Sequence, residues 1–268
     1  ECAREQVARL IGASAKEIIF TSGGTESINT ALHGMFAGES TRRRVVTTTV
    51  EHPAVLRVCE RLDARGHAVD YVGVDGDGQM DRAQWQRTVT PETAVASFQH
   101  ANNETGVVQD VAALAAIAAE RGVIVHVDAV QAAGKTPIDV HSWSVNLLSI
   151  SAHKFHGPKG VGALYVRRRT RLDPLMVGGT QERQLRGGTE NVAGIVGMGV
   201  AAEIAASRLS ETIGDVAGLR DAFESGVQAA VPFAHVNGRS APRVCNTSNV
   251  SFAELEAEAI LLLLSEAG

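Results

Sequence analysis

The sequence is poor in cysteine and has no long hydrophobic run. Its three cysteines, Cys2, Cys59 and Cys245, lie far apart and include no Cys-x-x-Cys pair. A disulfide framework or a zinc site is therefore not expected, and a reducing cytoplasm is the default compartment. Cys2 and Cys59 fall in expected helices, where a small buried thiol is the commoner explanation. The longest aliphatic run, residues 259–264, is far too short to span a bilayer, and no signal peptide is expected at the start.

An excess of basic residues is also missing. The chain has 25 Lys and Arg against 30 Asp and Glu, a net charge of −5. Neither a nucleic-acid partner nor an anionic membrane surface is expected from that balance. A metal site is not expected either: the turn at residues 75–78 lacks calcium-loop spacing, and Asp128 has no second carboxylate or Cys/His pair nearby.

What the sequence does contain is a regular alternation of strand-like and helix-like segments. Strands are expected at residues 17–20, 44–50, 68–74, 94–98, 123–127, 145–150, 161–166, 235–237 and 248–252. Helices are expected at residues 1–11, 25–34, 53–66, 110–122, 190–207, 211–231 and from 254 onward. Alternation of this kind predicts an α/β fold with a mostly parallel, doubly wound sheet. We expect a large domain at residues 1–208 and part of a smaller C-terminal α+β domain at 209–268, so that the chain is an excerpt of a longer protein.

Lys154 is the first candidate functional residue. It follows a buried strand, beside His153 and ahead of a Gly-Pro turn. A lysine held there is placed for amine chemistry, although a solvated loop lysine is the usual explanation for a single lysine. We expect Lys154 to be the only lysine on the strand-end face, because Lys159 lies in the turn.

Other polar residues also follow expected strands. Gly24 and Thr25 open a helix after a strand, which is the geometry that binds phosphate, although alone it is equally ordinary turn chemistry. His52 precedes Pro53 at a strand-to-helix junction, where a capping or surface histidine is the alternative. Asp128 ends a nearly unbroken β-branched run, where a carboxylate is costly unless a cation meets it; a helix N-cap is the alternative.

In doubly wound sheets, ligands bind beyond the carboxyl ends of the strands, so these residues are expected to converge. Pyridoxal phosphate (PLP) fits them: it needs a lysine amine for a Schiff base and an acid at the ring nitrogen. Lys154 and Asp128 would supply these two groups. The other expected ligands are Gly24, Thr25, Ser151 and His153 for the phosphate, His52 stacked on the ring, Gln131 at the phenolic oxygen, and Asn103 at the substrate or the ring oxygen.

Six segments resemble the NifS/IscS-type cysteine desulfurases of the class V aminotransferase superfamily, PLP fold type I, in order and with matching spacing. They are Thr21-Ser-Gly-Gly-Thr-Glu-Ser27, Glu51-His52, Asn102-Asn-Glu-Thr-Gly-Val-Val108, His126-Val-Asp-Ala-Val-Gln131, Ser151-Ala-His-Lys154 with Gly157-Pro-Lys-Gly160, and Arg186-Gly-Gly-Thr-Glu-Asn191.

The resemblance implies a homodimer that converts L-cysteine to L-alanine and places the sulfur on an enzyme cysteine. It implies that Lys154 carries PLP and moves the Cα proton, with His52 as a further acid or base. It also implies that Asn103 holds the substrate carboxylate and that Thr189 reaches the phosphate of the neighbouring subunit. The sulfur acceptor stays open between an iron–sulfur scaffold, a tRNA-thiolation carrier and a DNA-modifying system.

The chain departs from this family at both ends, where the opening segment and the loop with the persulfide-forming cysteine are missing. Cys245 precedes the strand at 248–252, whereas the family's nucleophile follows the next helix. Two alternatives remain: another class V PLP enzyme, such as a selenocysteine lyase or an aminotransferase, and a non-enzymatic nucleotide-binding or adaptor domain. The second leaves Asp128 and Lys154 unexplained.

Overall fold

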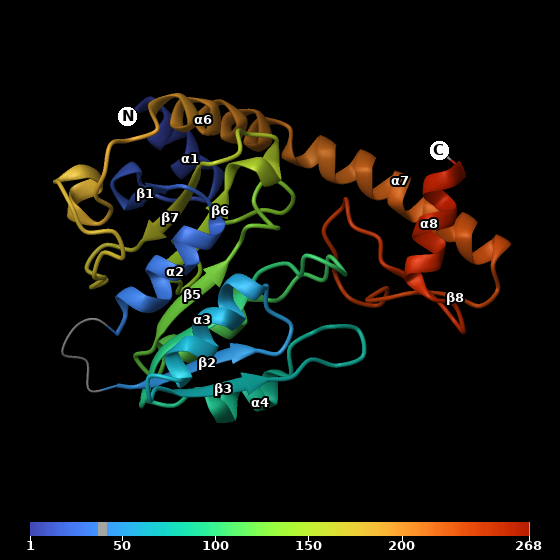
Figure 1. Ribbon diagram of the computed structural model, residues 1–268, viewed down its shortest axis with the longest axis horizontal. Helices are drawn as coiled ribbons and strands as arrows, with labels where there is room; N and C mark the ends of the chain where they lie inside the picture. Colours follow the sequence, from blue (N-terminus) through green and yellow to red (C-terminus); the bar gives the residue numbers. More distant parts are fainter. Residues whose placement is uncertain (37–41, 268) are drawn as a thin grey trace.

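The structure, a computed structural model, describes residues 1–36 and 42–267. A seven-stranded sheet with the order β1-β7-β6-β5-β4-β2-β3 forms its centre (Figure 1). The strands are β1 (Ile18–Thr21), β2 (Arg44–Thr48), β3 (Ala68–Val72), β4 (Thr93–Gln99), β5 (Ile124–Asp128), β6 (Leu147–Ser151) and β7 (Gly162–Val166). All neighbours are parallel except that β7 runs antiparallel to β1 and β6. The prediction of a mostly parallel α/β sheet is confirmed.

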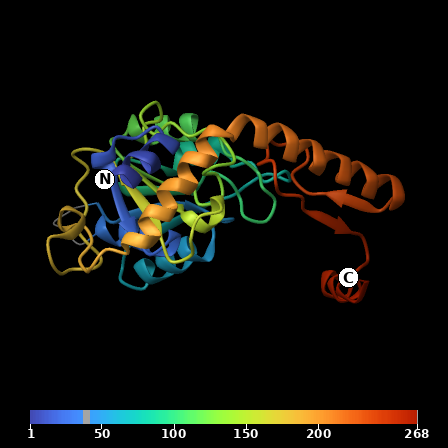
Figure 2. The same cartoon turned by 90° about the horizontal axis from the view of Figure 1, so that it is seen from above.

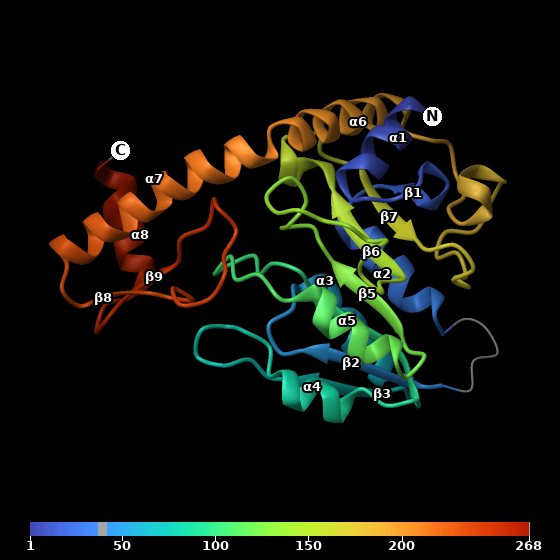
Figure 3. The same cartoon turned by 180° about the vertical axis from the view of Figure 1, so that it is seen from behind.

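Helices cover both faces of this sheet (Figures 1 and 3). On one face lie α1 (Cys2–Leu10), α4 (Arg82–Thr88), α5 (Val111–Ala119) and α6 (Val192–Ser207); on the other lie α2 (Gly24–Gly34) and α3 (Pro53–Asp63). Successive strand residues point to opposite faces. Val45 thus packs with α2 and α3, whereas Val46 packs in the larger core with the other four helices. Because both faces are covered, every residue of β1, β4, β6 and β7 is buried, whereas the edge strand β3 has exposed residues.

Short polar side chains cap the N-termini of several helices, close to the positions where the sequence predicts these helices to begin. Asp110 accepts a hydrogen bond from the Ala113 N–H at 3.1 Å, and Asn191 accepts one from Gly194 at 3.1 Å. These bonds satisfy backbone donors that the first helical turn leaves unpaired. The capped helices α5 and α6 then pack on the sheet face opposite α2 and α3.

One helix, α4, was absent from the prediction. It has seven residues, and Trp85 is its one buried side chain, donating its indole N–H to the Leu114 carbonyl at 3.1 Å. A single buried residue leaves no periodic pattern to read in the sequence. The Asp81 cap, which accepts from the Gln84 N–H at 2.8 Å, was its best signal.

Some element ends and one cysteine also differ from expectation. β3 stops at Val72, and Glu17 lies in a 3-10 turn (Ala15–Glu17) before β1, with its buried carboxylate accepting the Ser14 N–H at 3.0 Å. Cys59 is buried as expected, but Cys2 is exposed. The expectation of a buried Cys2 was wrong because Cys2 begins α1 ahead of the helix's buried positions.

After α6 the chain leaves the large sheet, as Figure 2 shows. This part consists of α7 (Leu209–Ala230), the antiparallel pair β8 (Ala234–Val236) and β9 (Val250–Phe252), and α8 (Ala257–Ala267). It touches the main sheet's loops where Val108 N–H donates to the Pro242 carbonyl at 2.8 Å. The domain boundary between residues 208 and 209 stays a prediction. Gly268, the last residue of the expected C-terminal domain, lies outside the described residues.

Within the described ranges no single helix is long and apolar enough to cross a membrane. Taken as a pair, α6 and α7 reach the length and composition of a span, but they are bent by 73° relative to each other.

Candidate active site

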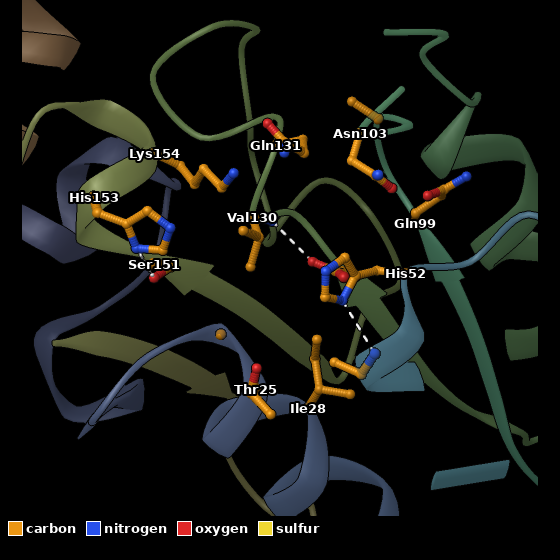
Figure 4. Close-up of a pocket in the computed structure, with 14 residues that line it drawn as sticks. Thr25, Ile28, His52, Gln99, Asn103, Val130, Gln131, Ser151, His153 and Lys154 are labelled. Carbon is orange, nitrogen blue, oxygen red and sulfur yellow. Dashed lines mark hydrogen bonds between the residues drawn. The ribbon is translucent and has the colours of Figure 1, made fainter. Parts of the chain in front are cut away.

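A cavity of about 370 Å³ lies at the carboxyl ends of the parallel strands. Gln99, Asp128 and Ser151 are the last residues of β4, β5 and β6, and all three line it. The cavity is lined by all the predicted site residues except Thr189: Gly24, Thr25, His52, Asn103, Asp128, Gln131, Ser151, His153 and Lys154. Figure 4 shows these side chains converging from separate elements. Parallel strands bring residues together in this way because their carboxyl ends share one edge.

Lys154 is held by a short 3-10 turn, Ala152–Phe155, that follows β6 directly. The turn ends at His156, which has a left-handed backbone with φ 66°, and Gly157 N–H donates back to the Ala152 carbonyl at 2.9 Å. Phe155 is buried in the main core, whereas Lys154 is half-buried. The lysine amine is therefore presented to the cavity on a backbone anchored at both ends.

Asp128 is buried, and one carboxylate oxygen accepts the Val130 N–H at 3.0 Å. Burial raises the pKa of this carboxyl, while the Val130 N–H and electrostatic interactions with His52 and Lys154 act in the opposite direction. A buried carboxylate in these surroundings is stabilised by a cationic partner in the cavity. A protonated ring nitrogen is such a partner.

Glycines shape the end of the cavity near α2. A Cβ on Gly24 would lie 2.7 Å from Val130 Cγ2, and a Cβ on Gly162 would lie 2.7 Å from the Gly23 Cα. Substitution at Gly24 would force the start of α2 away from Val130, and substitution at Gly162 would force the loop after β1 away from β7. The glycines thus let the start of α2 approach Ser151, whose hydroxyl shares a 2.9 Å hydrogen bond with His153 Nδ1. Unpaired N–H groups and hydroxyls here suit an anion such as phosphate.

His52 serves as the N-cap of α3 and also lines the cavity. Its Nδ1 accepts the Ala54 N–H at 3.1 Å, so the neutral ring carries its proton on Nε2. In Figure 4 the ring points into the cavity. The capping role and the site role are therefore compatible, since they use different ring atoms.

Glu51 lies beneath the cavity and did not enter the predicted site. It is buried, and its Oε1 accepts the Thr48 hydroxyl at 2.5 Å and the Gln99 N–H at 3.0 Å, while Oε2 has no partner. Burial, with a smaller contribution from Asp128, raises the pKa of Glu51 to about 8. Glu51 is therefore mostly neutral at pH 7, which leaves Asp128 without a second negative charge beside it. The position of Glu51 between a buried strand and His52 was the sequence feature that could have indicated its place near the site.

Lys135 is a second lysine close to the cavity. Its Nζ donates to Gln131 Oε1 at 3.1 Å. The expectation that Lys154 is the only lysine at this edge was wrong. Lys135 lies in the turn after β5, seven residues beyond Asp128, and the turn folds back toward the strand ends.

Thr189 is exposed and lines a different cavity, of about 130 Å³, together with Arg186 and Glu182. Arg186 forms an ion pair with Glu26 on α2 at 2.9 Å. This ion pair connects the loop that carries Thr189 to the end of the cavity where phosphate is expected. The expected contact of Thr189 with a neighbouring subunit stays a prediction. In residues 1–36 and 42–267, no group of His, Cys, Asp and Glu side chains could hold a metal ion.

Comparison with known proteins assigns the chain to a known family. The family described as aminotransferase class-V matches the chain over residues 1–268. The chain belongs to the aminotransferase class-V family. This family is PLP-dependent, and the seven-stranded sheet matches structures of PLP fold type I.

Several similar proteins are named as cysteine desulfurases. The chain is 47% identical over 266 residues to the cysteine desulfurase of Trichormus azollae, covering 99% of the chain and 66% of that protein. A solved NifS-like protein superposes with a TM-score of 0.94 at 41% identity, over 99% of this chain and 73% of that one. A structure of SspA in complex with cysteine has a TM-score of 0.85 at 34% identity, over 99% and 74%. The chain thus spans 66% of the length of the first of these relatives.

The residues of the cavity fit PLP. Asp128 offers a buried carboxylate for a pyridine N–H, and Lys154 offers an amine. The start of α2 lies close to both Val130 and Ser151, since a Cβ on Gly24 would lie 2.7 Å from Val130 Cγ2 and 3.7 Å from Ser151 Cβ. An aldehyde, a ring nitrogen and a phosphate therefore each have a matching group on the chain.

Proposed function

We propose that the protein containing this chain is a PLP-dependent cysteine desulfurase. It takes L-cysteine, breaks the bond between Cβ and sulfur, and releases L-alanine while the sulfur joins an enzyme thiol as a persulfide. The main observation in support of this proposal is that Lys154 and Asp128 line one cavity, beside a glycine loop suited to bind phosphate. The names of relatives 46–49% identical support the choice of reaction.

Each lining residue has a role in this proposal. When bound, PLP supplies an electron sink for the carbon chemistry. Lys154 holds the cofactor through its amine and moves the proton at the substrate Cα, with His52 Nε2 as a second proton carrier. Asp128 keeps the ring nitrogen protonated, and Gln131 binds the ring's phenolic oxygen. The phosphate is held by Gly24, Thr25, Ser151 and His153, and the substrate carboxylate by Asn103.

The thiol that accepts sulfur lies outside this stretch in our proposal. Burial raises the pKa of the Cys59 thiol to about 12, and Cys245 is only 3% exposed. A thiolate is the nucleophile, so neither is placed to react. Cys2 is exposed at the start of α1 and does not line the cavity. We further propose a cytoplasmic homodimer in which Thr189 contacts the partner's phosphate, and a separate protein that receives the sulfur.

The test uses the full-length protein with PLP, L-cysteine and a thiol reductant. Sulfide and L-alanine should appear in equal amounts, and Lys154→Ala should abolish both, together with the visible absorbance of lysine-bound cofactor. The matched control, Lys16→Ala, changes an exposed lysine and should keep both. Turnover of selenocysteine but not cysteine would instead indicate a lyase of that kind, and a keto-acid product an aminotransferase. A protein that stays colourless with PLP would favour a non-enzymatic domain.

A further inference from the structure

Lys135 and Gln131 form a pair at the edge of the active-site cavity. Gln131 lines the cavity, and Lys135 lies behind it, with Nζ donating to Gln131 Oε1 at 3.1 Å. The two residues are four apart in the turn after β5, where Ala133 N–H donates to the Ala129 carbonyl at 3.0 Å as in a helix. The hydrogen bond between their side chains shows that Gln131 and Lys135 lie on the same side of this turn.

The lysine determines which end of the Gln131 amide faces the cavity. A primary amide has one acceptor oxygen and a donor nitrogen, and a lysine amine donates to the oxygen. Oε1 is therefore engaged by Lys135, and Nε2 is left for the cavity. In Figure 4 the Gln131 oxygen points away from the cavity interior and the nitrogen points toward it. Without Lys135, the amide could turn by half a rotation and present its oxygen instead.

Packing fixes the turn that carries this pair. Gly134 has φ +75°, and a Cβ there would lie 2.9 Å from Phe155 Cβ and 3.2 Å from Ala205 Cβ. Phe155 directly follows Lys154, and Ala205 is on α6. The turn is thus pressed against the segment that presents Lys154, so Lys135 has little freedom to leave Gln131.

We propose that Lys135 is a positioning residue that holds the Gln131 amide with its nitrogen toward an anionic oxygen of the bound ligand. This rests on the proposed function, in which that oxygen is the phenolic oxygen of PLP. A donor and a nearby cation favour the deprotonated form of that oxygen. Lys135 therefore keeps the bound cofactor in its deprotonated form at lower pH than Gln131 alone would.

The charged surroundings of Lys135 are compatible with this role. The titratable groups that face it are Lys154, His153 and Cys245. Burial lowers the pKa of Lys135, the Lys154 ammonium lowers it further, and Cys245 acts in the opposite direction. The amine donates to Gln131 in either protonation state, so the amide stays oriented across the working pH range.

The experiment measures the pH midpoint of the visible absorbance change of PLP bound to the full-length protein. Lys135→Met should raise this midpoint by about one pH unit, the effect of one hydrogen bond to a charged group. Lys135→Arg, which keeps the donor and the charge, should recover most of the shift. The control Lys16→Met should leave the midpoint unchanged. If Lys135→Met does not fold, Lys135→Leu also removes both the donor and the charge at this half-buried site and carries the same expectation.

A double variant tests whether Lys135 acts through Gln131. Gln131→Met should raise the midpoint by itself, and adding Lys135→Met should raise it little further, because effects transmitted through one residue do not add. Additive shifts, or an unshifted Lys135→Met protein that binds PLP, would overturn the inference. A wild-type protein without the absorbance band would refute the proposed function instead.

Discussion

Asp128 is the residue whose charge matters most at the site. It is buried at the end of β5 and accepts the Val130 N–H through one oxygen. Asp128→Asn keeps that acceptor and the side-chain shape but removes the charge opposite the ring nitrogen. We expect turnover of cysteine to fall by about 10²-fold or more. Steady-state assays of the full-length protein measure this loss.

The matched control for that substitution is Asp110→Asn. Asp110 also accepts a backbone N–H at a helix start, from Ala113 at 3.1 Å, but it is exposed and remote from the cavity lining. This variant should keep wild-type turnover. Equal rates for Asp128→Asn and wild type would remove Asp128 from the proposed site.

Glu51 gives a second prediction, on stability against pH. Its pKa is raised from 4.5 to about 8 in the folded chain, so the folded state binds more protons than the unfolded state between these values. Stability is therefore lost as pH rises through this window. Glu51→Gln keeps the acceptor for Thr48 and Gln99 and does not ionise. The stability of the variant relative to wild type should increase by about 1.4 kcal/mol per pH unit up to about pH 8.

Denaturant titrations of wild type and Glu51→Gln at several pH values from 5 to about 8 check this slope. As a comparison, Glu60→Gln alters an exposed carboxyl near the carboxyl end of α3 and should show no such trend. A constant difference between Glu51→Gln and wild type would mean that Glu51 is ionised in the folded protein.

At the scale of elements, the approach of the loop after β1 to β7 depends on Gly162. A Cβ there would lie 2.7 Å from both the Gly23 Cα and the Ile150 carbonyl oxygen. Gly162→Ala should cost about 1–3 kcal/mol of stability through overpacking and push the glycine loop out of place. The apparent affinity for PLP should fall several-fold. Thermal unfolding and cofactor titration measure the two effects.

Gly218→Ala is the control for that change. Gly218 lies inside α7 with nothing within 4 Å of an added Cβ. Alanine is favoured over glycine in a helix interior by about 1 kcal/mol, so stability should rise and PLP affinity should stay the same. PLP binding by Gly162→Ala at wild-type affinity would show that the loop tolerates displacement.

The elements also show what a sequence allows one to predict. The β-branched residues in the segment 123–127 correctly predicted β5. The polar residues that follow the predicted strands correctly marked the edge of the cavity, because the direction of parallel strands alone brings these residues together. Lys135 escaped prediction because its approach depends on how the turn after β5 packs on Phe155, which no local pattern encodes. Glu51 was not predicted for a similar reason, because its burial depends on tertiary packing against Gln99. Helix α4 was missed because one buried tryptophan makes no period.

At the scale of the whole molecule, stability is unevenly distributed between the large sheet and the C-terminal part. Val125 and Val127 in β5 are fully buried, whereas α8 has no buried residue and its leucines 261–264 are 62–67% exposed. An eleven-residue helix without packing is marginal in water, as is a two-stranded sheet. In a dilute solution of the 268-residue chain, α8 amides should therefore exchange close to the unprotected rate, while β5 amides exchange through global unfolding.

Hydrogen exchange followed residue by residue makes this comparison within one sample, with β5 as the internal reference. Replacing Leu262 and Leu263 by Gln should leave α8 exchange unchanged in dilute solution, since the two side chains are 64% and 67% exposed and gain little packing on folding. Protection of α8 that increases with protein concentration and disappears in this variant would show that the leucine face associates between copies. Protection equal to that of β5 in dilute solution would contradict the prediction, because it would require contacts that the fold does not provide to α8.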